Sequence, residues 1–119
     1  MRLILASLFF ATLLPASDWP RFRGPNGTGV SPDRGLPAEI SRDRNTVWKT
    51  KTPKGNSSPI VIRDRVFITG HEGNERLLLC YDAKKGDLRW RKGVTKARTE
   101  VANPLNGPTT PSPATDGRA

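Results

Sequence analysis

The sequence is short of the residue types from which most enzyme and metal sites are built. Its 119 residues include one cysteine, Cys80, and one histidine, His71. A single cysteine excludes an intramolecular disulfide and any metal site made of clustered thiolates. We interpret Cys80 as a small apolar side chain within a strand, and His71 as a solvated residue of a glycine-flanked loop. The residues therefore predict no catalytic, cofactor-binding or metal-binding group in this chain.

Long apolar runs are absent after the N-terminus. Residues 3–14 form an uncharged, largely apolar stretch that follows Arg2 and precedes the small residues Ala16 and Ser17. This stretch is too short to span a bilayer, but its charged, apolar and small order is typical of a secretory signal peptide. We predict a signal peptide over residues 1–17, a periplasmic or secreted location, and no membrane span after cleavage. An uncleaved anchor and a buried N-terminal helix are the alternatives.

Acidic residues are scarce compared with basic ones. The chain carries 20 Lys and Arg against 11 Asp and Glu, which gives a formal net charge of +9. The basic residues are spread along the chain, however, and no nucleic-acid-binding motif accompanies them. We predict no nucleic-acid partner, and we keep binding to an anionic polymer outside the cytoplasm as an alternative function.

Helical periodicity is also missing after the apolar stretch. Residues 18–45 are dense in proline and glycine, which predicts an irregular segment rather than a helix or a central strand. Within it, Trp19 and Phe22 are expected to attach the segment to a folded body by burying aromatic surface.

Strand patterns begin at residue 46 and continue to residue 92. Residues 46–51 alternate, and four further runs are rich in β-branched, aromatic or aliphatic residues. Their short connections predict an antiparallel meander, with residues 70–75 as a polar loop. The four runs are residues 58–62, 65–70, 76–82 and 87–92.

Two of these runs are apolar at consecutive positions, so both faces of the sheet need cover. Since no helix is available, the cover must be further sheets, which favours a β-propeller over a two-sheet sandwich. A short repeat agrees with this interpretation, because Ser58-Pro59 recurs as Ser112-Pro113. The spacing is slightly longer than that of common propeller repeats.

Three residues at and after the end of the third run, Asp82, Gly86 and Trp90, each have a structural explanation. Asp82 can accept hydrogen bonds from the amides of the following turn. Gly86 can adopt the positive φ that closes such a turn. Trp90 then projects from the next strand, where its ring can pack between this sheet and a neighbouring one.

Residues 81–90, YDAKKGDLRW, resemble the blade signature of the pyrroloquinoline-quinone-like (PQQ-like) β-propeller repeats at Asp82, Ala83, Gly86 and Trp90. Lys85 stands where that signature usually has threonine. Residues 18–37 and 45–69 are also similar to the N-terminal region of exported bacterial members. The resemblance implies an all-β fold in which these four residues form a structural blade motif.

The resemblance also implies a division of the chain. An irregular N-terminal segment (18–45) precedes the first blade (46–92), whose leading strand is a candidate for the closing blade of the ring. A connector (93–110) and the truncated start of a second blade (111–119) follow. We therefore expect a propeller fragment with one four-stranded antiparallel blade.

Members of this family include non-catalytic scaffolds, such as a component of the outer-membrane barrel-assembly machinery, and quinoprotein dehydrogenases that bind PQQ and calcium. This chain lacks the adjacent cysteine pair of the dehydrogenases. We expect an exported scaffold, with no cofactor in this fragment, that binds protein partners or further blades. The alternative is the N-terminal part of a PQQ-dependent oxidoreductase whose site lies in other blades.

Overall fold

A computed structural model describes residues 16–97 and 105–118 of the chain. Most of the predicted signal peptide and the middle of the predicted 93–110 connector lie outside these residues. Among the described residues, no helix has the length and apolar character needed to cross a membrane.

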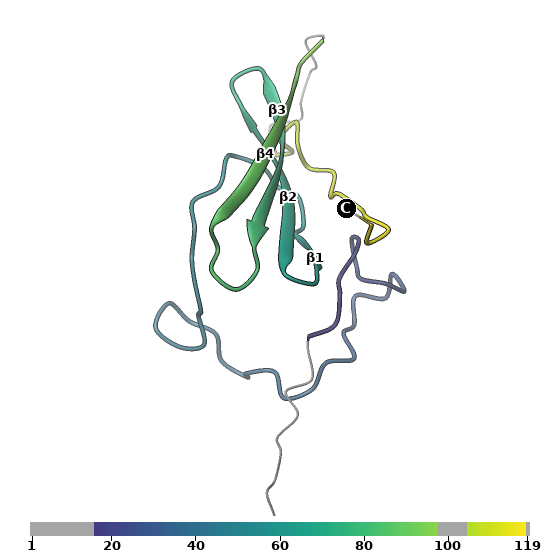
Figure 1. The fold of residues 1–119 in the computed structure, drawn as a ribbon, viewed down its shortest axis with the longest axis vertical. Helices are drawn as coiled ribbons and strands as arrows, with labels where there is room; N and C mark the ends of the chain where they lie inside the picture. The colour runs from purple at the N-terminus through teal and green to yellow at the C-terminus, as the bar shows by residue number, and fades with distance from the viewer. Residues whose placement is uncertain (1–15, 98–104, 119) are drawn as a thin grey trace, which may run out of the picture.

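The folded body is a single four-stranded antiparallel sheet (Figure 1). The strands follow one another in chain order, and the described residues contain no helix, as the meander prediction required. The sheet consists of β1 (Ile60–Ile62), β2 (Arg65–Glu72), β3 (Glu75–Asp82) and β4 (Leu88–Thr95).

Two tight turns set the register of the first three strands. Arg63 and Asp64 connect β1 to β2, as the sequence predicts. The predicted polar loop over residues 70–75 is wrong, because β2 and β3 continue to a two-residue turn of Gly73 and Asn74. Gly73 has a φ of 53°, a conformation that glycine adopts without steric cost. The predicted loop of six residues is therefore a turn of two.

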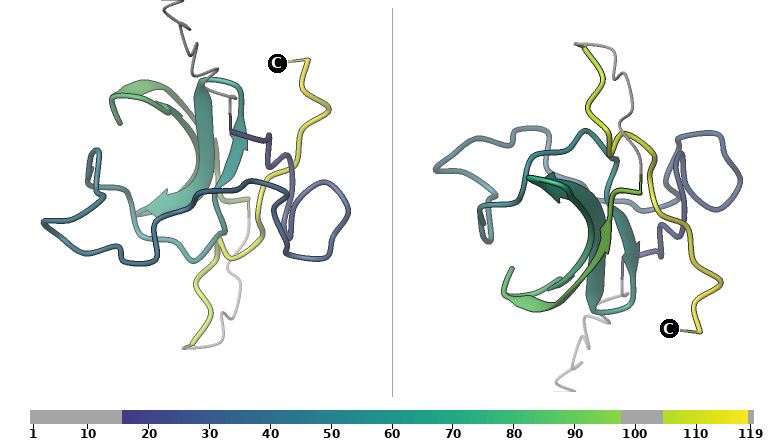
Figure 2. Two further views of the ribbon diagram at one scale, coloured as in Figure 1. Left: turned by 90° about the horizontal axis from the view of Figure 1, so that it is seen from below. Right: turned by 90° about the horizontal axis from the view of Figure 1, so that it is seen from above.

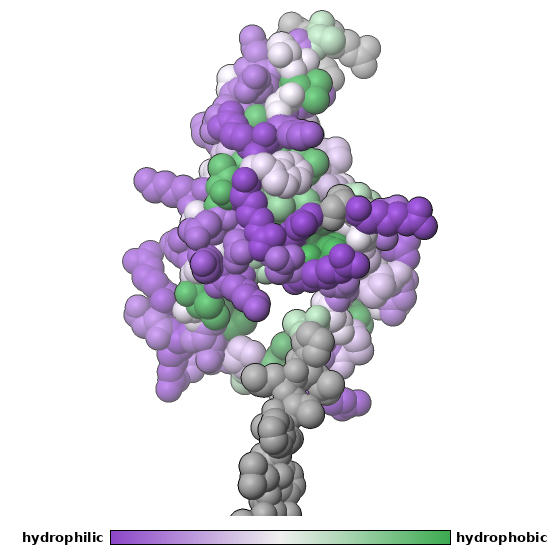
Figure 3. Space-filling view, viewed as in Figure 1, coloured by the Kyte–Doolittle hydropathy of each residue, from purple (hydrophilic) through white to green (hydrophobic). Residues whose placement is uncertain are grey.

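The sheet is apolar on both faces, as the consecutive apolar residues predict. Ile60, Phe67 and Cys80 are paired across β1, β2 and β3, and they form one buried cluster. On the opposite face, Leu77 and Leu79 are buried together with Tyr81. The alternation along β3 separates the two clusters, since successive side chains point to opposite faces. Seen as in Figure 1, the surface shows apolar residues as separate spots among polar ones (Figure 3).

The N-terminal segment is irregular, as expected, but of the two aromatic residues expected to attach it, only Trp19 does so. Trp19 pairs with Val61 through two backbone hydrogen bonds of 2.6 and 2.9 Å, which extend the sheet beyond β1. Phe22, in contrast, is 61% exposed, so the prediction that it anchors the segment is wrong. From Trp19 the chain loops away from the sheet before it returns along the other side (Figures 1 and 2).

The alternating residues 46–51 do not form the predicted strand. Their pattern is that of a strand, but no described segment forms a ladder with them. Trp48 instead packs against the turn between β3 and β4, which makes this stretch a second attachment of the N-terminal segment.

Candidate functional site

The turn between β3 and β4 is built around the carboxylate of Asp82. One of its oxygens, Oδ1, accepts hydrogen bonds of 2.9 Å from the amides of both Lys84 and Lys85. The Asp82 carbonyl accepts a third bond, of 2.8 Å, from the amide of Gly86. Gly86 has a φ of 75°, so both the hydrogen bonding of Asp82 and the conformation of Gly86 agree with the sequence prediction.

Arg89 links this turn to the turn between β1 and β2. Its Nη2 lies 2.5 Å from Oδ2 of Asp82 and 2.6 Å from Oδ2 of Asp64. A backbone hydrogen bond of 2.9 Å, from the Ala83 amide to the Asp64 carbonyl, joins the same two turns. The end of the sheet is therefore fixed by one cation shared between two carboxylates.

The contacts among Asp64, Asp82 and Arg89 shift the pKa values of all three side chains. The side-chain hydrogen bond from Arg89, followed by that from the Lys85 amide, lowers the pKa of Asp82 to about 2. The hydrogen bond from Arg89 also lowers the pKa of Asp64. The same bonds, that to Asp82 first, raise the pKa of Arg89. All three groups are consequently charged near neutral pH, as a structural ion cluster requires and a proton-transferring group does not.

The side chain of Trp48 contacts the backbone at Ala83 and Gly86, a contact that the sequence did not predict. Nε1 of Trp48 donates a hydrogen bond of 2.8 Å to the Ala83 carbonyl. The Trp48 ring lies so close to Gly86 that a Cβ there would be 2.5 Å from the ring atom Cε3. The requirement for glycine at position 86 therefore has two causes, its positive φ and this ring.

Trp90, the last residue of the predicted motif, packs on its own sheet. It is paired with Cys80, and its ring centroid lies 5.8 Å from that of Phe67 at an interplanar angle of 56°. We expected the ring to pack between this sheet and another one. Within the described residues, Pro113, Ala114 and Thr115 of the C-terminal segment line a small cavity together with Trp90.

The two copies of the Ser-Pro repeat lie side by side. The Ser58 amide donates a hydrogen bond of 2.9 Å to Oγ of Ser112. Beyond it, the Thr115 amide donates to the Pro20 carbonyl at 3.1 Å. The second copy thus starts beside Ser58, just before β1, and runs past the face of the sheet that carries Phe67 and Trp90 to the N-terminal segment.

His71 is not a solvated loop residue as the sequence suggested. It belongs to β2 and is half-buried, and its Nδ1 lies 3.1 Å from Oγ1 of Thr109. Its amide also donates a hydrogen bond of 2.7 Å to the Lys54 carbonyl. Both partners are distant in sequence, so no local pattern identifies these contacts.

Cys80 is fully buried, as predicted for a small apolar strand residue, and burial raises the pKa of its thiol. Residues 16–97 and 105–118 contain no group of three or more His, Cys, Asp or Glu side chains placed to hold a metal ion.

Comparison with known proteins gives no further identification. No protein-family model, no curated protein and no solved structure matches this chain.

Proposed function

We propose that this chain is part of an exported β-propeller of the PQQ-like repeat type and serves as a non-catalytic scaffold that binds other proteins. The observation that carries the proposal is the contact between the two repeat copies, Ser58 and Ser112, at the edge of the sheet. Copies of a repeat that meet in space are expected of stacked units, which bury their apolar faces against their neighbours.

The two-sided apolar sheet supports the same proposal. Leu79 on one face and Ile60 on the other are each only 1% exposed. A sheet that packs on a single partner layer needs one apolar face, whereas a propeller blade needs two. The ion cluster of Asp64, Asp82 and Arg89 supports a scaffold, because it uses its charged groups to join two turns.

Site-specific photo-crosslinking in cells that naturally express the chain tests this function. A photoreactive residue is placed at Leu88, which lies on the outermost strand β4 and is 48% exposed. We expect a discrete crosslinked product with one extracytoplasmic protein. The matched control carries the same residue at Leu79, which is buried and should give no such product.

The absence of any discrete product from position 88 would contradict the scaffold role. The alternative function places the PQQ site in other blades, so it is tested separately by titrating an assembled propeller that contains this chain with PQQ, with and without calcium. Saturable, calcium-dependent binding of PQQ would favour the oxidoreductase and overturn the non-catalytic assignment.

A further inference from the structure

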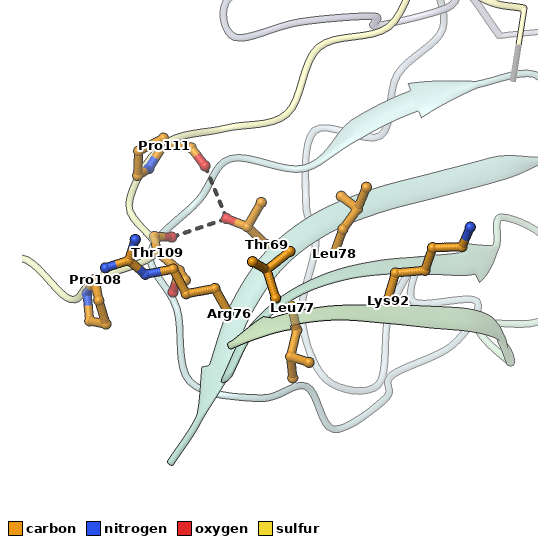
Figure 4. Close-up of a pocket in the computed structure, with 9 residues that line it drawn as sticks. Thr69, Arg76, Leu77, Leu78, Lys92, Pro108, Thr109 and Pro111 are labelled. Atoms are coloured by element: carbon orange, nitrogen blue, oxygen red, sulfur yellow. Dashed lines mark hydrogen bonds between the residues drawn. The ribbon is translucent and has the colours of Figure 1, made fainter. Parts of the chain in front are cut away.

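A cavity of about 410 Å³ opens on the face of the sheet that carries Phe67 and Trp90. One wall is formed by the sheet, through Leu78 of β3 and Val94 of β4. The opposite wall is formed by Pro108 and Pro111 of the C-terminal segment (Figure 4). Its volume lies in the range of small-molecule sites, which are usually lined mainly by apolar groups.

The wall formed by the C-terminal segment is held in place by hydrogen bonds. Thr69 Oγ1, on β2, lies 3.1 Å from the Thr109 carbonyl oxygen and 2.9 Å from that of Pro111. The Thr109 hydroxyl also meets His71, and Thr109 is only 4% exposed. The cavity is therefore largely formed before any ligand arrives, which reduces the entropy cost of binding.

The charged residues that line the cavity are of one sign within the described part of the chain. There, Arg76 and Lys92 line it, and no carboxylate does. The Arg76 side chain extends toward Pro108 and Thr109, whereas Lys92 lies at the other end, beside Leu78 (Figure 4). Lys92 is exposed, so its ammonium group is available to a ligand at the mouth of the cavity. An apolar floor with a cation at its mouth selects a ligand with an apolar body and one negative end.

We propose that this cavity binds a small alkyl monocarboxylate, such as a medium-chain fatty acid. The carboxylate pairs with Lys92, and the alkyl chain lies across Leu78 and Val94 toward Pro108. This site does not depend on the proposed scaffold function, because the residues named in the argument all belong to this chain.

The test is a titration of the ¹⁵N-labelled chain with octanoate, below its micelle threshold, followed by NMR. We expect saturable shifts centred on the amides of Thr69, Leu78 and Val94. In the variant Lys92→Glu, the side chain at position 92 repels the octanoate carboxylate instead of attracting it. Octanoate binding should therefore weaken about tenfold. Binding of 1-octanol, which has no charge, should be unchanged in the same variant.

The matched control is Lys85→Glu, an equal charge change at an exposed position in the β3–β4 turn, away from the cavity. It should bind octanoate like the unmodified chain. Absence of saturable shifts in the unmodified chain would overturn the proposal, as would equal weakening by the two variants. If octanoate and 1-octanol bind equally well to the Lys92→Glu variant and to the unmodified chain, the assigned role of Lys92 is wrong. Failure of this site leaves the crosslinking test of the scaffold unaffected.

Discussion

The sheet and the N-terminal segment that precedes it differ in the burial of their apolar side chains and in the sequence distance of their hydrogen-bond partners. In the sheet, apolar side chains are buried and backbone groups pair between strands, so each strand depends on residues distant in sequence. In the segment, hydrogen bonds join near neighbours, such as Thr46 to Ser41 and Arg44 to Glu39. Its apolar residues Val30, Leu36 and Ile40 are all at least 67% exposed.

Two tryptophans connect these regions. Trp19 continues the hydrogen-bonding pattern of β1, and Trp48 covers the turn that follows β3. Between them the segment takes its shape from local turns. Stability is therefore concentrated in the sheet, whereas the segment is positioned by its two ends. Substitutions in the two regions should therefore differ widely in effect.

The largest effect is expected from Leu79→Ala, in the centre of β3. Leu79 is 1% exposed, and loss of a buried leucine side chain costs about 2–5 kcal/mol in unfolding free energy. Urea denaturation followed by circular dichroism measures this loss. Val94→Ala, in the same sheet but 72% exposed, is the control. Similar losses in both variants would show that the buried cluster is not the source of stability.

The next effect tests the attachment of the segment to the sheet. Gly86→Ala introduces a Cβ at positive φ and within 2.5 Å of the Trp48 ring, so we expect a loss of about 1–3 kcal/mol and a change in tryptophan fluorescence. Gly73→Ala is the control, because Gly73 also has a positive φ but faces open space. The fluorescence change should be confined to the first variant. If the two variants behave alike, Trp48 does not restrain this turn.

A smaller, pH-dependent effect is expected at the ion cluster. The folded pKa of Asp82, about 2, lies below the unfolded value of about 3.9. Its contribution to stability is therefore present above about pH 4 and is lost as the pH falls through about 2. Arg89→Met should raise the pKa of Asp82 toward the unfolded value, which an NMR titration of its carboxyl carbon measures.

The control for this titration is Arg118→Met. Arg118 pairs with Asp116 at 3.7 Å on an exposed surface, and its loss should leave Asp82 unchanged. An unaltered Asp82 pKa in the Arg89 variant would mean that the turn amides alone stabilise the carboxylate.

The smallest effect is expected in the N-terminal segment. Ile40 is 72% exposed, so Ile40→Ser should change the unfolding free energy by less than about 0.5 kcal/mol. Urea denaturation measures the unfolding free energy of this variant on the same scale as that of Leu79→Ala. A loss above 1–2 kcal/mol would contradict the division between a stable sheet and a locally ordered segment.

The features that sequence alone could predict are those determined within a few residues. The four strand runs after residue 57, the Arg63-Asp64 turn, the bonds from turn amides to Asp82 and the positive φ of Gly86 all depend on neighbours along the chain. The structure reproduces each of them. The apolar pattern of β3 also predicted correctly that both faces are buried.

The features that the sequence did not predict depend on contacts between residues that are far apart in the sequence. Residues 46–51 have the alternation of a strand, but a strand also needs a partner, and Trp48 finds a turn instead. The glycines that flank His71 predict a loop, whereas His71 pairs with Arg76 in the β2–β3 ladder and also contacts Lys54 and Thr109. The walls of the cavity come from the sheet and from residues 108–111, so its existence depends on the path of a connecting segment.

The contact between Ser58 and Ser112 also bears on the order in which the chain folds. The hairpins of the sheet join residues that are close in sequence, and hairpins of this kind form in about 1–10 μs. The Ser58–Ser112 hydrogen bond closes a loop of 54 residues. Closing such a loop costs more chain entropy than a hairpin and gains only a few contacts. We expect the sheet to form first and to provide the surface on which the second repeat copy is then ordered.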